Sequence, residues 1–328
     1  MTSQKDGASH AHLAGLSQCK RIWDCPVCAA NIAGERRNEL GELIKAHGEA
    51  GGSVYMTALT VPHGRFDDLK ALRFTVSTIW RKVQAGKAWR DAKLKLGLVG
   101  TVRALEVTHG KNGWHPHLHL LFFFPATAGE KTIERFGRWL FKRWARYVRD
   151  ADQGECNENV YQFERARSSE QAGAYVTKWG SEWEMLGAQG KTGKNGNKTP
   201  WQLLHEAADG DQPAGELFVR YSKGMKGARQ LTYSKGLRQA YKLAEALPDS
   251  ELDIEAGPNG ANAGTPLGYL SGHAMQALDR KGLILSLLEA VEEEPSWNTV
   301  FGFLLSHGIP IDFICRRSSG PRFDDIAA

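Results

Sequence analysis

Two apolar segments joined by a short turn signal stand in the middle of the chain. The first, LVGTVRALEVTHG at residues 98–110, alternates apolar and polar residues as a β-strand does. KNG follows, and its Asn-Gly pair favours a tight turn. The second, PHLHLLFFFP at residues 116–125, is apolar over most of its length. We therefore predict a β-hairpin in the middle of a sheet.

Two histidines of the second segment point to metal chemistry. Residues two apart in a strand share a face, so His117 and His119 project together, and His115 has the same parity although Pro116 disturbs the strand there. Glu106, in the preceding strand, comes near the pair if the register places it on that face. Two imidazoles and a carboxylate suit Mn²⁺ or Mg²⁺, while the alternative is a strand with surface histidines. The opposite face is apolar and is predicted to be core: Leu118, Leu120, Phe122 and Phe124.

The rest of the chain alternates between helical and strand patterns, which indicates a mixed α+β fold. We expect a mobile tail over residues 1–15, helices over 31–50, 67–84, 132–149 and 169–184, and strands ending at Val61 and within 159–166. The uncharged stretch AGPNGANAGTP at 256–266 is predicted to be a linker. This divides the chain into residues 1–50 with a cysteine-rich segment, a main domain at 51–255, and a small helical extension at 267–328.

Composition limits the location and the partners. The net charge of +5 permits a nucleic-acid partner without demonstrating one. No run of apolar residues is long enough to cross a bilayer, and the first residues contain no apolar signal core, so we expect a cytoplasmic protein with no membrane partner. Five cysteines, three of them within residues 19–28, are not typical of a secreted disulfide framework.

The three clustered cysteines form a candidate zinc site. Cys19, Cys25 and Cys28 have the spacing Cys-x5-Cys-x2-Cys, and Cys-x2-Cys around a proline is typical of half of a structural zinc site. His10 or His12 could supply a fourth ligand. Buried free thiols are the alternative.

A tyrosine and a lysine share one face of the helix predicted at 169–184. Tyr175, Lys178 and Glu182 fall at helical positions i, i+3 and i+7. A phenol has a pKa of about 10, so it becomes a nucleophile near neutral pH when a cation favours the phenolate or when a metal activates the electrophile. Glu170 is a further candidate acid or base. A packed tyrosine beside a solvated lysine is the alternative interpretation.

Basic residues occur where they could contact a polyanion. The helix predicted at 132–149 combines arginines and lysines with Trp139 and Trp144, and YSKGMKGARQLTYSKGLR at 221–238 adds positive charge. A solvated charged helix is the alternative. The residues that we predict to contact DNA are Arg138, Lys142, Arg146, Lys235 and Arg238.

Three segments, TALTVPHG, EVTHGKNGWHPHLHLLFF and AYVTKWGSE, resemble in order and spacing the three motifs of rolling-circle plasmid replication initiators of the HUH endonuclease superfamily, single-tyrosine type. The match spans roughly residues 55–185. The resemblance implies a central antiparallel sheet flanked by helices, an RRM-like core. It implies Mn²⁺ or Mg²⁺ bound by His117, His119 and Glu106, with Tyr175 as the nucleophile.

The resemblance also implies a reaction and partners. Attack on a single-stranded or extruded DNA origin would leave a 5′-phosphotyrosine and a free 3′-OH that primes synthesis. A glutamate shortly before the tyrosine ends the cycle in such enzymes. Glu170 is the nearest match, although five residues turn it away from the tyrosine on a regular helix, and Glu182 shares the face but follows the tyrosine. A host helicase and a single-strand-binding protein are the expected partners.

Three other classes remain as alternatives. A transposase or conjugative relaxase would share the chemistry. A non-catalytic zinc- and DNA-binding copy-control protein would leave Tyr175 and the histidine pair without a role. A cupin-type metal enzyme would need a glutamate a few residues after His-x-His, and residues 118–124 contain none.

Overall fold

The computed structural model describes residues 2–5, 8–11, 13, 19–167, 171–172, 197–249, 267–309 and 314–315. The chain divides into two compact units, one formed by residues 19–252 and the other by residues 1–18 with 253–328. The predicted linker at 256–266 and most of the helix predicted at 169–184 lie outside the described residues. No helix in the described part is long and apolar enough to span a membrane.

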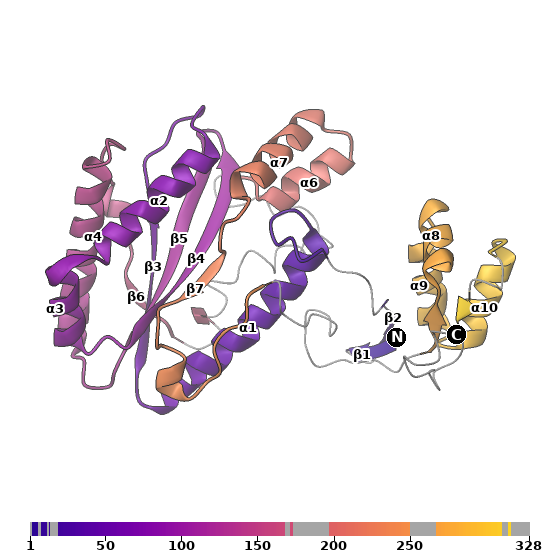
Figure 1. The fold of residues 1–328 in the computed structure, drawn as a ribbon, viewed down its shortest axis with the longest axis horizontal. Coiled ribbons are helices and arrows are strands. Elements are labelled where there is room, and N and C mark those ends of the chain that lie inside the picture. The colour runs from indigo at the N-terminus through magenta and orange to yellow at the C-terminus, as the bar shows by residue number, and fades with distance from the viewer. Residues whose placement is uncertain are drawn as a thin grey trace, which may run out of the picture. The chain divides into compact units, whose positions relative to one another are not determined.

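A five-stranded antiparallel sheet forms the centre of the larger unit, with the strand order β6-β3-β5-β4-β7 (Figure 1). The predicted hairpin is confirmed, because β4 and β5 pair from Gly100 with Phe123 to Gly110 with Gly113. The strand β3 pairs with the other edge of β5. The strands are β3 (Ser53–Thr60), β4 (Gly100–Gly110), β5 (Gly113–Phe124), β6 (Glu164–Arg165) and β7 (Leu231–Tyr233).

Helices cover both faces of this sheet, so the predicted α+β fold is confirmed. On one face, Leu40 and Leu43 of α1 pack in a buried cluster with Val54, Leu121 and Phe123. On the other face, side chains of α2 and α4 form an aromatic core with the alternate residues of β5. In that core the ring centroid of Phe122 lies 6.3 Å from that of Trp80 and 5.5 Å from that of Phe136. The helices and short turns of this unit are α1 (Pro26–Glu49), α2 (Leu69–Val83), α3 (Gly86–Leu96), α4 (Glu130–Arg149), α6 (Pro200–Ala208), α7 (Gln212–Met225), and the 3₁₀ turns η1 (Glu158–Val160) and η3 (Gln239–Tyr241).

Local signals explain where several helices begin. The prediction started the first helix at residue 31, but α1 begins five residues earlier, because Cys25 caps it and Pro26 occupies its first turn. The helix α6 begins with a capping box in which Thr199 and Gln202 satisfy each other's backbone N–H groups. The helices α3, α6 and α7 were not predicted from the sequence.

The smaller unit contains the helical segment predicted after residue 267. Its helices are α8 (Gly272–Arg280), α9 (Ile284–Glu293) and α10 (Trp297–Ser306), and they share a core that includes Leu278, Leu287 and Leu304. Short antiparallel pairs join β1 (Thr2–Lys5) to β2 (Ala8–Ala11) and β8 (Tyr269–Leu270) to β9 (Ile314–Cys315).

Candidate metal centre and nucleic-acid interface

The register of the hairpin brings the three predicted metal ligands onto one face of the sheet. Glu106 of β4 lies directly opposite His117 of β5, and Ala104 lies opposite His119. On the other side of β5, Thr60 and Ala58 of β3 pair with the same two histidines. Since directly paired residues point to the same side of a sheet, Glu106, His117 and His119 converge. We call them the metal triad.

The triad's side chains are in direct contact. The Nε2 atom of His117 is 2.9 Å from Oε2 of Glu106, and Nε2 of His119 contacts the same oxygen. The Nδ1–H of His117 donates to the carbonyl oxygen of His115 over 3.1 Å, which fixes the ring and turns Nε2 toward Glu106. Burial alone would raise the pKa of Glu106, but the charge and hydrogen bonds of His117 and His119 hold that pKa well below its ordinary value.

These donors suit a divalent cation. One ligand atom from each of the three residues can be chosen so that all lie within 4.8 Å of one another. Two imidazole nitrogens and a carboxylate oxygen are donors that Mn²⁺ accepts. The sheet therefore brings three candidate ligand atoms together.

A cavity of about 740 Å³ opens beside the triad. Its walls include His117, His119 and Tyr161, and they also include His63 and His115, whose rings stack with their centroids 4.8 Å apart. Burial and the neighbouring imidazoles of His117 and His63 lower the pKa of His115 to about 4, so its ring is neutral at pH 7. His63 was not among the site residues predicted from the sequence. Its position in VPHG, directly after the strand that pairs with the histidine strand, was the available signal.

The predicted tyrosine helix is only partly described. Tyr175, Lys178, Glu170 and Glu182 lie outside the described residues. Ala172, three residues before Tyr175, is fully buried in the cluster that contains Leu121 and Phe123. That cluster lies on the same face of the sheet as His119, because residues 119, 121 and 123 alternate with the opposite face.

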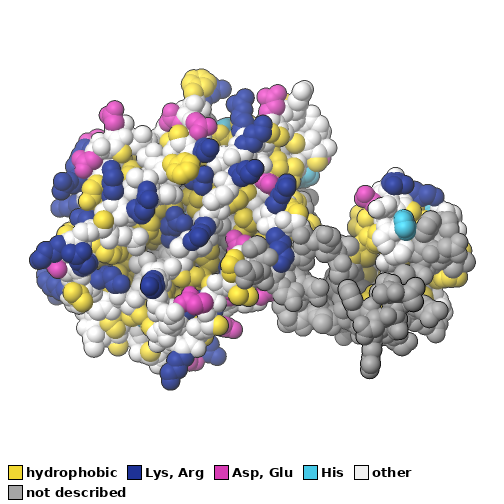
Figure 2. Space-filling view, viewed as in Figure 1, with side chains coloured by type: hydrophobic (Ala, Val, Ile, Leu, Met, Phe, Trp, Pro, Cys, Tyr) yellow, Lys and Arg dark blue, Asp and Glu magenta, His cyan; other side chains and the backbone are white. Residues whose placement is uncertain are grey.

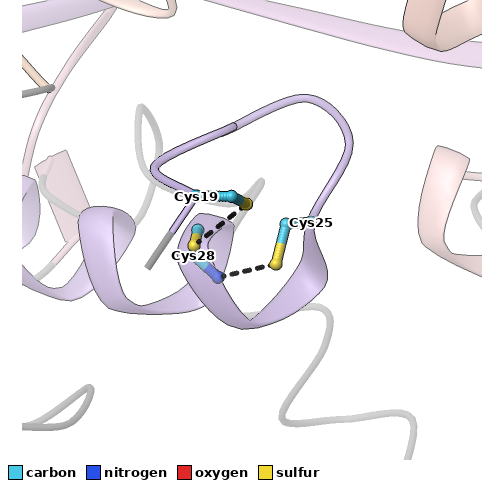
Figure 3. A group of neighbouring side chains, drawn as sticks. All are labelled: Cys19, Cys25 and Cys28. Atoms are coloured by element: carbon cyan, nitrogen blue, oxygen red, sulfur yellow. Dashed lines mark hydrogen bonds between the residues drawn. The ribbon is translucent and has the colours of Figure 1, made fainter. Parts of the chain in front are cut away.

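The three cysteines predicted to bind zinc lie together at the start of α1, as Figure 3 shows. The Sγ atoms of Cys19 and Cys28 are 3.6 Å apart, and the backbone N–H of Cys28 donates to Sγ of Cys25 over 3.5 Å. Burial and the hydrogen bonds with Cys19 and Cys25 raise the pKa of the Cys28 thiol to about 11. Burial also acts to raise the pKa of Cys19, but the hydrogen bond from the Arg21 backbone and those with the other two thiols leave it lowered.

Neither candidate for a fourth zinc ligand can be placed beside this cluster. His10 belongs to the other compact unit, and His12 lies outside the described residues.

The cysteine segment is anchored to residue 228 and to the helix α7. The indole N–H of Trp23 donates to the carbonyl of Ala228 over 3.0 Å, and its ring meets Tyr221 of α7 edge-on. Ile22 and Trp23 line a small cavity of about 20 Å³ that Glu106 also lines. The segment between the cysteines thus shares a small cavity with the strand that carries Glu106.

Comparison with known proteins identifies the family. Residues 10–259 match the family model described as "Replication protein". The chain belongs to this replication protein family. It is 26% identical over 305 residues to "Protein rep" of Streptomyces lividans, a match that covers 73% of this chain and 66% of that protein. It is 30% identical over 142 residues to "Neomycin resistance protein" of Streptomyces cyanogenus, covering 36% of this chain and 32% of that protein. No solved structure matches significantly.

The match to the replication protein family includes every residue predicted to contact DNA. Arg138, Lys142 and Arg146 are exposed along α4, and Lys235 is exposed just after β7. Arg238 differs from them, because it is only 6% exposed and donates to the backbone carbonyls of Ala244 and Glu39. Its guanidinium is used inside the fold, and it is not among the residues that we propose to contact DNA.

Proposed function

We propose that this member of the replication protein family initiates rolling-circle replication of a plasmid or a similar element by nicking one DNA strand through Tyr175. The observation that carries the proposal is the convergence of Glu106, His117 and His119 on one face of the sheet. The chain that leads to Tyr175 packs on that same face at Ala172. Family membership and the 26% identity to "Protein rep" support a role in replication.

We propose that the metal triad holds Mn²⁺ or Mg²⁺. Such an ion acts as a Lewis acid that draws negative charge from a phosphate oxygen. The triad fits this task, because Glu106 supplies an anionic oxygen and the bond from His117 Nδ1 to the His115 carbonyl fixes which nitrogen faces the site. The adjoining cavity has room for a nucleotide, and the rings of His63 and His115 form part of its wall.

The chemical step that we propose is an in-line transfer. The phenolic oxygen of Tyr175 loses its proton to solvent or to a nearby base and bonds to the phosphorus atom. The bond from phosphorus to the 3′-oxygen breaks, and that oxygen takes up a proton to become the free 3′-OH. Lys178 favours the phenolate or holds the phosphate. Glu170 is the first candidate for the acid that ends the cycle by directing hydrolysis, with Glu182 as the second.

We also propose that Cys19, Cys25 and Cys28 bind a structural Zn²⁺. Three thiols that converge at a helix start match the thiolate ligands that zinc prefers, and Ile22 and Trp23 of the same turn line a small cavity together with Glu106. The ion would hold this turn in place rather than take part in the chemistry. The proposed location is the cytoplasm, with a host helicase and a single-strand-binding protein as partners.

A covalent-adduct assay tests the proposed nick. The protein is incubated with Mn²⁺ and single-stranded oligonucleotides from a plasmid-derived library, labelled either at the 5′ or at the 3′ end, and separated on a denaturing gel. A 5′-phosphotyrosine link keeps the 3′ label on the protein and releases the 5′ label. We expect this pattern for the wild type and for Tyr269→Phe, an exposed tyrosine of the smaller unit. The adduct should disappear in Tyr175→Phe and in EDTA.

Other outcomes would point elsewhere. An adduct in Tyr175→Phe would refute the assignment of the nucleophile. Tight DNA binding without an adduct on any substrate, supercoiled plasmid included, would favour a non-catalytic DNA-binding protein. A nicked product whose 3′-OH is not extended by a polymerase but whose 5′ end is joined to a second DNA would favour a transposase or relaxase.

A further inference from the structure

A second basic cavity, of about 690 Å³, lies on the face of the sheet opposite the metal triad. Thr101, Arg103 and Leu105 of β4 form part of its lining, and they alternate with Ala104 and Glu106, which face the triad's side. Its other walls come from α2 and from residues 227–235, which include β7. We call it the basic groove. Its cationic residues are Arg73, Arg81, Arg103, Arg229 and Lys235.

Two arginines form the buried part of the groove. Arg73 is only 8% exposed, its guanidinium lies 4.7 Å from the centroid of the Phe74 ring, and its Nε has no hydrogen-bond partner. Arg103 is half-buried and donates to the Thr232 hydroxyl over 3.1 Å. Burial lowers the pKa of Arg73, and burial together with the nearby charge of Arg229 lowers that of Arg103. Both cations are thus held in an environment that disfavours their charge.

No counter-charge within the described residues offsets this cost. The described residues that line the groove include neither Asp nor Glu, and none of its five cations forms an ion pair with a described carboxylate. Arg81, Arg229 and Lys235 are exposed. Figure 2 shows Lys and Arg side chains on the face over α2. A buried guanidinium without an anion is costly, so a site that gathers such groups is suited to an anionic ligand.

We propose that the basic groove binds successive phosphates of a DNA backbone, at a place separate from the metal triad. Arg73 and Arg81 are eight residues apart on α2, which corresponds to about 12 Å along a helix, more than one phosphate group spans. Hydroxyls of Ser77, Thr78 and Thr232 add donors, and Phe74, 55% exposed, offers a ring on which a base can stack. The choice of DNA as the polyanion rests on the proposed function.

The position of the groove predicts what it contributes. Because it lies behind the sheet, DNA bound there is not the phosphodiester at the triad but a flanking stretch. The groove should therefore raise the affinity for DNA and its dependence on salt, while the chemistry at saturating DNA proceeds without it.

Fluorescence anisotropy with a labelled single-stranded oligonucleotide, measured in EDTA over a series of salt concentrations, tests the groove. Arg73→Gln and Arg103→Gln should each weaken binding several-fold and reduce the slope of log K against log salt by about 0.7 for each phosphate that is no longer neutralised. The double variant Arg81→Gln/Lys235→Gln should reduce it by about twice as much, and since both side chains are exposed, this variant does not depend on core packing. Arg90→Gln, an exposed arginine of α3 outside the groove, is the matched control and should bind like the wild type.

The outcomes separate the groove from the nuclease proposal. Wild-type affinity and slope in all groove variants would overturn the inference. A second result would also overturn it: inorganic pyrophosphate stabilises the wild type against heat but not the groove variants, while the DNA affinity of the variants stays unchanged. The ligand of the groove would then be a small phosphate compound. The two proposals can also fail separately. If the groove variants lose DNA affinity and the wild-type protein forms no tyrosine adduct, the groove is supported and the nuclease proposal is refuted. Glu106→Gln should give the reverse, with DNA binding kept and the adduct lost.

Discussion

Replacing Glu106 with glutamine should remove most of the metal-dependent stabilisation of the larger unit while leaving its shape intact. The substitution is nearly isosteric, and it deletes the one carboxylate among the three proposed ligands, whose Oε2 lies 2.9 Å from His117 Nε2. Losing a group that merely orients a ligand costs about 10- to 100-fold in metal affinity, so losing the carboxylate itself is expected to cost about 100-fold. That factor corresponds to about 2.7 kcal/mol of binding free energy.

The expected effect on stability follows from linkage. At a Mn²⁺ concentration about 100 times the wild-type Kd, binding stabilises the folded protein by about 2.7 kcal/mol, whereas a variant with a 100-fold weaker Kd gains only about 0.4 kcal/mol. The difference of about 2.3 kcal/mol corresponds to about 5 to 9 °C in Tm for a unit of this size. Differential scanning calorimetry with and without Mn²⁺ measures the shift for each protein.

The comparison uses the Mn²⁺-induced change in Tm, not the Tm itself, because Glu106→Gln also alters contacts with both histidines in the metal-free protein. Glu164→Gln, an exposed glutamate of the edge strand β6, is the matched control and should keep the wild-type shift. An undiminished Mn²⁺ shift in Glu106→Gln would refute the assignment of Glu106 as a metal ligand.

Three further predictions concern packing, pH and zinc. Gly52→Ala should lower the free energy of unfolding, measured by urea denaturation, by about 1 to 3 kcal/mol, because a Cβ there would lie 2.2 Å from Cε1 of the buried His47 ring. Gly48→Ala is the control and should not lower it, because the space around Gly48 is open. Burial lowers the pKa of His47, so as the pH falls the imidazole is protonated in the unfolded state before it is protonated in the folded state. The free energy of unfolding should therefore decline below a pH of about 6.5, and it should decline less steeply in His47→Gln. Elemental analysis of the purified protein should find one zinc per chain, and Cys28→Ser should lose it. Cys156 is a half-buried cysteine outside the cluster, so Cys156→Ser should keep the zinc. Equal zinc contents in the two variants would exclude the site.

The central sheet could be predicted because its signals are local. Alternation in residues 98–110, the Asn-Gly turn and the apolar run after it specify a hairpin without reference to any distant residue, and β4 and β5 pair as that pattern requires. The helices α6 and α7, which follow the stretch at 187–200 that is rich in Gly, Lys and Asn, were not predicted. Their capping signals, at Thr199 and Asp211, cover only single turns.

The alternation of residues in strands predicted part of the triad, and the pairing register decided the rest. His117 and His119 share a face in any strand, whereas Glu106 joins them only because the turn places residue 106 opposite residue 117. A register shifted by one residue would have placed Val107 opposite His117 and turned the carboxylate away.

Features that depend on contacts between distant segments needed the tertiary structure. The basic groove combines Arg73, Arg103 and Arg229, three residues that nothing in the sequence links. Arg238 belongs to a basic run in the sequence, yet its guanidinium is buried and bonded to carbonyls. Strand faces follow from the alternation of residues along the chain, and helix caps depend on residues within one turn, so both are encoded locally. Which cations meet in a cavity and which are satisfied internally depends on the fold, because burial and counter-charges come from residues far away in the sequence.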